Sequence, residues 1–309
     1  MNEIILHHYD ASPYAEKIRL ILGARRLPWR SVQIPWVMPK PDLVALTGGY
    51  RRTPVLQIGA DVYCDTALIA RVLDETGSAP LLHRPDRIAA LSVADLAERE
   101  LFGAAVGFVF QPRGFSALFQ GMGKAQIEAF MADRKAMRAG GAPRMELSEA
   151  TGLLHHWLQR VTDHLADGRA FLVADEPTIA DFAVYHPLWF VARAPALATV
   201  LGEYPAVSAW MARVAGFGHG TSSPMSAEDA LAAARAASPA APQAHPWVDW
   251  HGCQPGDEVI IEPADYGIVP VRGLLAISAP DRLALRRTDP RAGEVLVHFP
   301  RVGYRLRRP

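Results

Sequence analysis

The chain of 309 residues has only two cysteines, Cys64 and Cys253, and they lie too far apart to form a C-x-x-C pair. It also has no excess of either charge, because 32 Lys and Arg residues balance 32 Asp and Glu residues. The scarcity of cysteine argues against a disulfide framework and favours a reducing compartment. The balanced charge removes the global field that would attract nucleic acid or an anionic membrane surface.

Long apolar runs are missing as well. The stretch 101–110 is too short to span a bilayer, and the stretch 182–201 is interrupted by arginine, histidine and proline. The N-terminus lacks the basic start and the apolar core of a signal peptide. We therefore expect a cytoplasmic protein that binds neither membranes nor nucleic acid.

The most informative segment is residues 53–66, which reads T-P-V-L-Q-I-G-A-D-V-Y-C-D-T. Pro54 cannot donate to a β-ladder, so it belongs at the start of the apolar strand that follows, and a cis Thr53-Pro54 bond suits that position. A turn and a second short strand lead to Asp65-Thr66 at a helix start, where a charged ligand end is readily held. The segment predicts a site for a small peptide.

The first part of the chain alternates strands and helices. Ser12 and Pro13 have the types preferred at a helix N-cap and at the first helical position. The predicted elements are a strand at 3–9, a helix at 14–25, a strand at 29–34, a short helix at 42–46, the hairpin, and a helix at 66–75. This βαβαββα order predicts an α/β thioredoxin-like domain over residues 1–80.

The remainder changes character twice. Helical patterns without convincing strands predict an all-α domain over residues 86–237; they cover 87–110, 124–138, 148–166, 179–192 and 206–214. A Ser226 cap then begins an alanine-rich helix, and a Pro/Ala linker occupies 238–246. Alternating segments at 258–262, 282–287, 294–299 and 302–306 predict a small β-rich domain, a barrel or an antiparallel sheet, over residues 247–309.

Several of these segments carry a family resemblance. The stretch Y-x-x-S-P-Y-A-E-K-I-R from Tyr9, the T-P-V-L strand and the Asp65-Thr66 pair resemble the N-terminal domain of glutathione S-transferases. The T-I-A-D segment at 178–181 and E-Y-P-A-V-S-A-W-M from Glu203 resemble the helical domain of that family. The resemblance covers roughly residues 1–237. It implies glutathione as co-substrate, no metal, and a homodimer.

Glutathione chemistry requires a group that stabilises its thiolate, since an ordinary thiol has a pKa of about 8.5. Ser12 is the first candidate, because a hydroxyl at a helix N-terminus donates a hydrogen bond where the helix dipole also favours negative charge. Tyr9 is the second candidate. Two plainer interpretations remain open at this point: Ser12 simply caps its helix, and Tyr14, a third phenol, simply packs.

For binding, the resemblance implies that Asp65 and Thr66 hold the γ-glutamyl end and that Val55 pairs through its backbone. Thr53 and Pro54 shape this strand start, and Arg52 is a candidate partner for the glycyl carboxylate, together with Arg51. The family more often has Glu or Gln followed by Ser in place of Asp65-Thr66. The plainer alternative is that this pair only caps a helix.

Other patterns predict no site. The pairs His7-His8 and His155-His156 are sequence neighbours and do not converge on one metal as histidines at i and i+4 do. Cys64 is interpreted as a small buried hydrophobe. The arginine excess in residues 271–309 is accompanied by few aromatic residues, which favours a solvated face or a domain contact over nucleic-acid binding.

The sequence therefore predicts a glutathione transferase-like enzyme that attacks a small hydrophobic electrophile. Phe108, Phe110 and Phe115 are candidates for the wall of the second-substrate site, with core packing as the alternative. Two other functions remain open. One is a glutathione-dependent lyase or isomerase, which begins with the same thiolate. The other is a non-catalytic binding or scaffold protein that acts through the β-rich C-terminal extension.

Overall fold

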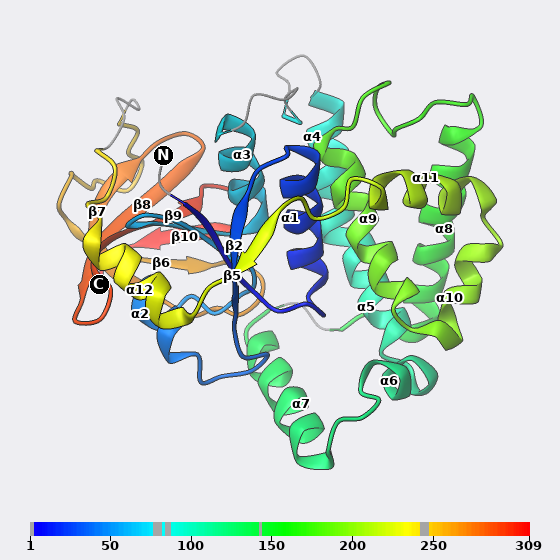
Figure 1. The fold of residues 1–309 in the computed structure, drawn as a ribbon, viewed down its shortest axis with the longest axis horizontal. Helices are drawn as coiled ribbons and strands as arrows, with labels where there is room; N and C mark the ends of the chain where they lie inside the picture. Colours follow the sequence, from blue (N-terminus) through cyan, green and yellow to red (C-terminus); the bar gives the residue numbers. More distant parts are fainter. Residues whose placement is uncertain (1–2, 77–81, 84–87, 142–143, 242–246) are drawn as a thin grey trace.

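A computed structural model describes residues 3–76, 82–83, 88–141, 144–241 and 247–309. Two predictions fall partly outside these residues, namely the start of the first long helix at Arg87 and the end of the linker at 242–246. All strands of the described residues belong to one sheet. The helical part lies on one side of its thioredoxin-like portion, and the C-terminal strands lie on the other (Figure 1).

The first elements follow the predicted order. They are β1 (Ile4–His8), α1 (Pro13–Ala24), β2 (Trp29–Gln33), α2 (Pro41–Thr47), β3 (Val55–Ile58), β4 (Asp61–Cys64) and α3 (Thr66–Thr76). Strand β1 pairs parallel with β2 and antiparallel with β3, and β3 forms a hairpin with β4. The thioredoxin-like N-terminal part is therefore confirmed.

The helical part is confirmed too. Its elements are α4 (Ile88–Leu96), the π-helical segment η1 (Ala97–Leu101), α5 (Phe102–Val109), α6 (Pro112–Leu118), α7 (Lys124–Arg138), α8 (Leu147–Leu165), α9 (Ile179–Ala192), α10 (Pro195–Gly202) and α11 (Pro205–Ala215). Helices α6 and α10 were not predicted, because each is short and begins at a proline. None of the described helices is long and apolar enough to cross a membrane.

After the helices the chain returns to the sheet. Strand β5 (Ser222–Pro224) pairs parallel with β2, and α12 (Ala227–Ala236) packs against α2 and β9. The Ser226 hydroxyl accepts a hydrogen bond of 3.0 Å from the Asp229 amide, which confirms the predicted cap of α12. This return was not predicted, because a three-residue exposed strand leaves no apolar pattern.

Residues 247–309, called the strand-rich region below, contain β6 (Glu258–Pro263), β7 (Val271–Ser278), β8 (Arg282–Asp289), β9 (Gly293–Pro300) and β10 (Tyr304–Arg307). Successive strands β6 to β9 pair antiparallel, and β10 pairs with β6. The expected antiparallel strands are present, with β7 added. They do not form a sheet of their own, because β9 pairs parallel with β4. The strand order of the continuous sheet is β10-β6-β7-β8-β9-β4-β3-β1-β2-β5.

Two hydrophobic cores sandwich the sheet. Leu6 and Leu56 face a core shared with α1, α3 and the helical part, while Ile5 and Val55 face a second core shared with α2, α12 and the strand-rich region. Successive residues of a strand point to opposite faces of the sheet. Because both faces are covered here, β1 and β3 carry apolar residues at adjacent positions. The strand-rich region is thus part of the core structure of the thioredoxin-like half.

Asp181 organises the helical part. Its carboxylate is fully buried and accepts hydrogen bonds from the Thr178 amide (2.9 Å), the Leu172 amide (2.9 Å) and Trp210 Nε1 (3.0 Å). The acid at the third helical position of α9 therefore joins the helix start to a preceding loop and to α11. The prediction that residues 178–181 form a folding element is confirmed.

We expect Asp181→Ala to lower the free energy of unfolding by roughly 3–5 kcal/mol, because these three donors and the Thr178 hydroxyl, which donates at 3.2 Å, lose their acceptor at once. Urea unfolding followed by circular dichroism measures this change. Glu149→Ala, at an exposed position of α8, is the control and is expected to shift stability by less than about 0.5 kcal/mol. Equal effects of the two substitutions would contradict the role given to Asp181.

Candidate active site

The junction of β1 and α1 presents the first candidate. Ser12 is buried and has extended backbone angles, φ −78° and ψ 119°, and its Oγ accepts a hydrogen bond of 3.2 Å from the Ala15 amide. The predicted N-cap is therefore confirmed. A hydroxyl that accepts from the helix still has its own proton to donate, so capping and thiolate stabilisation are compatible for the same side chain.

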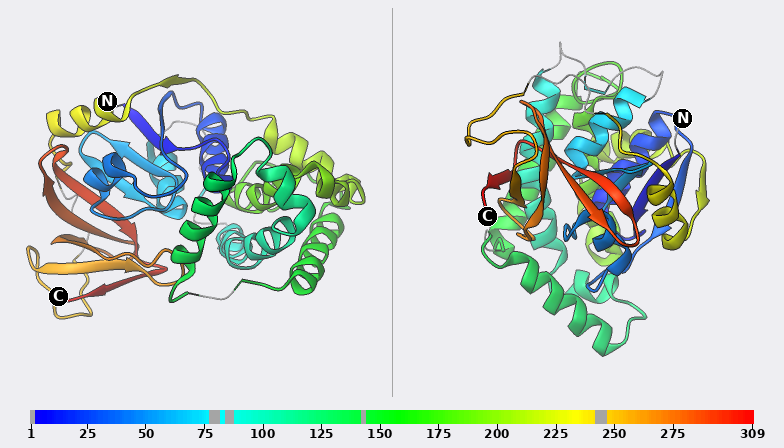
Figure 2. Two further views of the ribbon diagram at one scale, coloured as in Figure 1. Left: turned by 90° about the horizontal axis from the view of Figure 1, so that it is seen from below. Right: turned by 90° about the vertical axis from the view of Figure 1, so that its left-hand side faces the viewer.

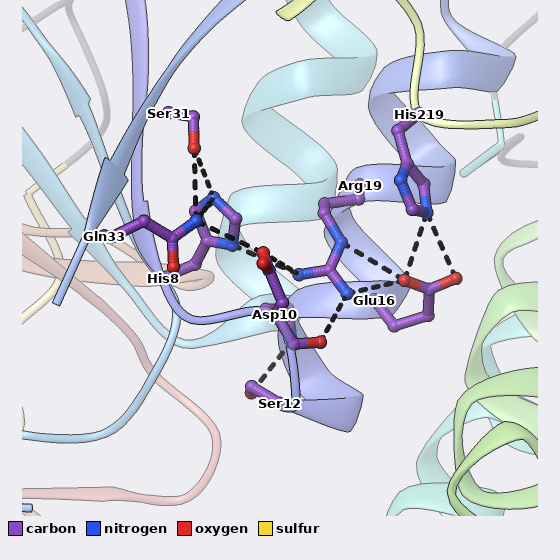
Figure 3. Close-up of polar contacts among 9 residues, drawn as sticks. His8, Asp10, Ser12, Glu16, Arg19, Ser31, Gln33 and His219 are labelled. Carbon is purple, nitrogen blue, oxygen red and sulfur yellow. Dashed lines mark hydrogen bonds and ion pairs between the residues drawn. The ribbon is translucent and has the colours of Figure 1, made fainter. Parts of the chain in front are cut away.

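A polar network behind Ser12 fixes the turn that carries it (Figure 3). Arg19 donates to the Asp10 carbonyl (3.0 Å), to Glu16 Oε2 (2.6 Å) and to His8 Nδ1 (3.1 Å). Burial and the Arg19 charge lower the pKa of His8 to about 4, so the ring is a neutral acceptor at physiological pH. His219 adds a contact of 3.2 Å to Glu16. The sequence signal that was missed is the acid and base at i and i+3 of α1.

Tyr9 lies beside Ser12 and contacts the helical part. Its ring stacks on Trp36 with centroids 5.5 Å apart, and its hydroxyl accepts a hydrogen bond of 3.4 Å from Arg134 Nη2 of α7. Burial raises the pKa of Tyr9 although Arg134 opposes the shift, so the phenol stays protonated and able to donate. Tyr14 instead packs between Phe102 and His186, at 4.5 and 4.8 Å between ring centroids.

The predicted cis bond at Thr53–Pro54 is confirmed, and Val55 follows it as a fully buried residue of β3. Thr53 Oγ1 accepts a hydrogen bond of 3.2 Å from Lys40 Nζ, which also lies 5.8 Å from the centre of the Tyr9 ring. Burial lowers the pKa of Lys40 to about 8. Lys40 was not predicted as a site residue, because it comes from the loop before α2, where a single lysine has no distinguishing pattern.

Asp65 and Thr66 join β4 to α3. Asp65 has φ 77°, an uncommon left-handed conformation for a non-glycine residue, and its Oδ1 accepts a hydrogen bond of 3.0 Å from the Ala67 amide. Burial raises the pKa of Asp65, although the Ala67 amide and the Arg52 charge favour its ionised form. Thr66 Oγ1 accepts a bond of 3.4 Å from Lys17 Nζ.

The two arginines before Thr53 point in different directions. Arg51 pairs with Asp133 of α7, whereas Arg52 pairs with Asp265 of the strand-rich region at 2.6 Å. Arg52 therefore lies near Asp65, where its charge acts on the carboxylate. Tyr9 lies near Ser12, and Lys40 contacts both Tyr9 and Thr53. Contacts from α7 and from residues 265–266 were not predicted, because they join positions more than 80 residues apart in the sequence.

A buried charged cluster connects the site to the helical part. Lys17 Nζ lies 2.6 Å from Glu98 Oε1 in η1, and His186 Nε2 of α9 lies 3.4 Å from the same oxygen. Burial alone would raise the pKa of Glu98, but Lys17 and His186 hold it at about 2. The π-helical turn carries Glu98 at the point where α1, α3 and α9 meet. Such π-helical turns often occur at functional sites.

Aromatic side chains from the helical part gather near Tyr9. Phe130 lies 6.4 Å from Trp36, 6.4 Å from Phe110 and 5.0 Å from Phe119, measured between ring centroids. Of the three phenylalanines predicted for the second-substrate wall, Phe108 is buried in the core, and Phe110 and Phe115 are partly exposed in this aromatic group. Figure 2 shows α7, which carries Phe130 and Arg134, lying between the strand-rich region and the other helices.

Both cysteines are free and buried, and burial raises the pKa of Cys64 well above its usual value. The interpretation of Cys64 as a small buried hydrophobe is consistent with this environment. Among the described residues, no three His, Cys, Asp or Glu side chains converge in a way that would hold a metal ion.

Comparison with known proteins agrees with this geometry. Residues 6–80 match the N-terminal domain of glutathione S-transferases, and residues 144–213 match their C-terminal domain. A GST-like protein from Pseudomonas syringae, known from a crystal structure, is 42% identical, with a TM-score of 0.83 over 99% of this chain and 100% of that one. The chain belongs to the glutathione S-transferase family. The match with the P. syringae protein extends over the strand-rich region.

More distant similarities cover a smaller part of the chain. FtsZ-localized protein A from Caulobacter vibrioides is 28% identical over 189 residues, which is 59% of this chain and 77% of that protein. The β-etherase LigF from Sphingobium sp. strain SYK-6 is 16% identical, with a TM-score of 0.52 over 69% of this chain and 94% of that one, a likeness of fold alone.

The Glu98 cluster gives a pH prediction. Because the folded-state pKa of Glu98 is about 2, below its ordinary 4.5, the ionised group contributes stability that is present above pH 4.5 and lost as pH falls toward 2. Glu98→Gln is expected to be less stable at neutral pH and to lose less stability over that acidic range. Urea unfolding at several pH values measures both effects. The control is Glu128→Gln, which removes an exposed i,i+4 pair with Lys124, and an identical pH profile for the two variants would contradict the assignment.

Proposed function

We propose that this family member is a glutathione transferase that binds glutathione and activates its thiol for attack on a small hydrophobic electrophile. The observation that carries the proposal is Ser12, a buried hydroxyl at the N-terminus of α1, adjacent to Tyr9 and anchored by the Arg19 network. Such a hydroxyl donates to a thiolate in the positive potential of a helix N-terminus, which favours loss of the thiol proton to solvent.

Each of the three residues of glutathione has its own set of candidate binding groups in the chain. Asp65 and Thr66 receive the γ-glutamyl end, the ammonium at the carboxylate and the carboxylate at the start of α3. Val55, after Thr53 and Pro54, pairs with the cysteinyl backbone. We assign the glycyl carboxylate to Lys40, which donates to Thr53. Arg52, the candidate from the sequence, pairs with Asp265 and its charge acts on Asp65, so we propose it for the γ-glutamyl side.

The electrophile is expected to lie against the aromatic group of α5 to α7. Phe110, Phe115 and Phe130 offer partly exposed rings close to Trp36, and Trp36 stacks on Tyr9. Apolar walls near a stabilised thiolate suit a hydrophobic substrate. Conjugation, elimination and isomerisation share the thiolate step, so steady-state assays with electrophiles of each class are needed to choose among a transferase, a lyase and an isomerase.

A homodimer and a cytoplasmic location complete the proposal. The dimer is an expectation from the family, and two free buried cysteines are consistent with a reducing compartment.

A scaffold role is the second candidate. It is favoured by three large exposed apolar side chains of the strand-rich region, Trp250 (69%), Leu274 (47%) and Val302 (70%), and by the similarity to a protein named for its localisation with FtsZ. Titration of the wild-type protein with glutathione separates the candidates, since the enzyme must bind it and the scaffold need not.

Ser12→Ala is expected to raise the pKa of the glutathione thiol in the complex by about 1–2 units, because a hydrogen bond to a charged group contributes roughly 1.5–3 kcal/mol. Thiolate absorbance during a pH titration measures the pKa, and calorimetry should find nearly unchanged affinity. Ser226→Ala, which removes the N-cap serine of α12 far from the site, is the matched control. If Tyr9→Phe and not Ser12→Ala moves the pKa, Tyr9 is the stabilising group.

Asp65→Asn is expected to weaken glutathione binding at least about tenfold, because the neutral amide cannot attract the α-ammonium group. Calorimetry at pH 7 measures the affinity. Asp42→Asn, at an exposed carboxylate that pairs with Arg291, is the control and should bind as the wild type does. Unaltered binding in the Asp65 variant would remove Asp65 from the site.

A further inference from the structure

The Asp65 carboxylate is held by a residue from the opposite end of the chain. The Tyr304 hydroxyl of β10 donates a hydrogen bond of 3.1 Å to Asp65 Oδ2 and lies 3.3 Å from the Tyr50 hydroxyl. The other carboxylate oxygen accepts from the Ala67 amide. A carboxylate has about four acceptor positions, so both oxygens of Asp65 retain capacity for another donor.

Asp65 also lacks a cation. Within the described part of the chain, no Lys or Arg nitrogen lies within 4.0 Å of its carboxylate, although it is half-buried. The two nearby cations have other partners, since Lys17 pairs with Glu98 and Arg52 pairs with Asp265, each at 2.6 Å. A partly buried carboxylate with hydrogen bonds but no counterion is suited to a ligand that brings its own positive charge.

Tyr304 is rigidly placed. Its side chain is 8% exposed, and its ring packs on Phe299 of β9 with centroids 5.5 Å apart. Pairing of β10 with β6 sets Tyr304 opposite Pro263. The turn after Pro263 is held by the contact of Arg52 with Asp265 and by a hydrogen bond of 2.6 Å from the Gly267 amide to the Met137 carbonyl at the end of α7. The hydroxyl that reaches Asp65 is therefore positioned by the core of the strand-rich region.

We propose that Tyr304 is a positioning residue through which the strand-rich region makes the site selective for ligands with a free α-ammonium group at the γ-glutamyl end. The hydroxyl orients Asp65 and stabilises its ionised form, and the ligand's ammonium group acts as the counterion. This inference rests on the proposed glutathione-binding function. It assigns to the C-terminal strands a role in ligand recognition.

The pH dependence of binding follows from the groups that face Asp65. They are Lys17 of α1, Glu98 of η1, Arg52, and the neutral groups Tyr14, Tyr50, Cys64 and Tyr304. Loss of the Tyr304 hydroxyl removes a donor that favours the carboxylate, so the pKa of Asp65 rises further. As pH falls, a Tyr304→Phe variant should then lose glutathione affinity at a higher pH than the wild type.

The test compares two ligands by calorimetry at pH values from 4.5 to 8. One is glutathione, and the other is glutaryl-cysteinyl-glycine, which is glutathione without its α-amino group. The proteins are the wild type, Tyr304→Phe, and the control Tyr63→Phe, which makes the same chemical change where Tyr63 of β4 stacks on His298 of β9. Circular dichroism verifies folding of each variant.

We expect the wild type to prefer glutathione over the analogue by about tenfold or more, and Tyr304→Phe to weaken glutathione binding about tenfold with little change for the analogue. Equal weakening for both ligands, or an unshifted pH profile, would overturn the proposal in favour of a structural role. Tighter binding would overturn it in favour of a blocking contact. If Tyr304→Phe does not fold, a wild type without preference between the ligands still overturns it. A wild type that binds neither ligand refutes the proposed function itself.

Discussion

The pairing of β9 with β4 determines how the two ends of the chain cooperate. Strand β4 ends at Cys64, one residue before Asp65, and its outer edge is occupied by residues 296–298 of β9. This parallel pairing covers an edge that would otherwise present unpaired backbone groups. It also brings β10 close enough for Tyr304 to reach Asp65. The same hydrogen bonds thus protect the sheet and bring a C-terminal side chain to the site.

Most charged groups of the candidate site are neutralised by a direct ion-pair partner. Arg19 with Glu16, Lys17 with Glu98, and Arg52 with Asp265 each form a pair at 2.6 Å. Buried charges are costly unless paired, so these contacts explain how a region with many charged groups folds at all. Among the described residues, Asp65 and Lys40 have no such partner. Asp65 accepts hydrogen bonds from the Ala67 amide and the Tyr304 hydroxyl, and the charges of Lys17 and Arg52 near it are paired elsewhere. That difference is why we propose Asp65, and not the paired carboxylates, as a ligand-binding group.

Local patterns in the sequence were enough to predict much of the fold and some backbone features of the candidate site. Ser12 before Pro13, the proline at the start of β3, and the acid before α3 are signals contained within a few residues, and each corresponds to a backbone feature of the structure. Arg134 and Tyr304 reach the candidate site from distant segments, and no spacing in a single sequence indicates such contacts. Lys40 comes from the nearby loop before α2, where a single lysine has no distinguishing pattern. Arg52 was predicted as a partner of the glycyl carboxylate, but its direction depends on Asp265, which lies 213 residues away.

The two ends of the candidate site differ in how firmly they are built. At the γ-glutamyl end, Tyr304 packs on Phe299 and Tyr50 within the second core, so its hydroxyl has little freedom. At the electrophile end, Phe110, Phe115 and Phe130 remain partly exposed, and α7 carries mostly exposed side chains. Under the proposed function, firmly placed polar groups lower the entropic cost of ordering the co-substrate, whereas loosely packed aromatic rings accommodate varied apolar shapes. We therefore expect the proposed enzyme to recognise the γ-glutamyl end strictly and to tolerate varied electrophiles.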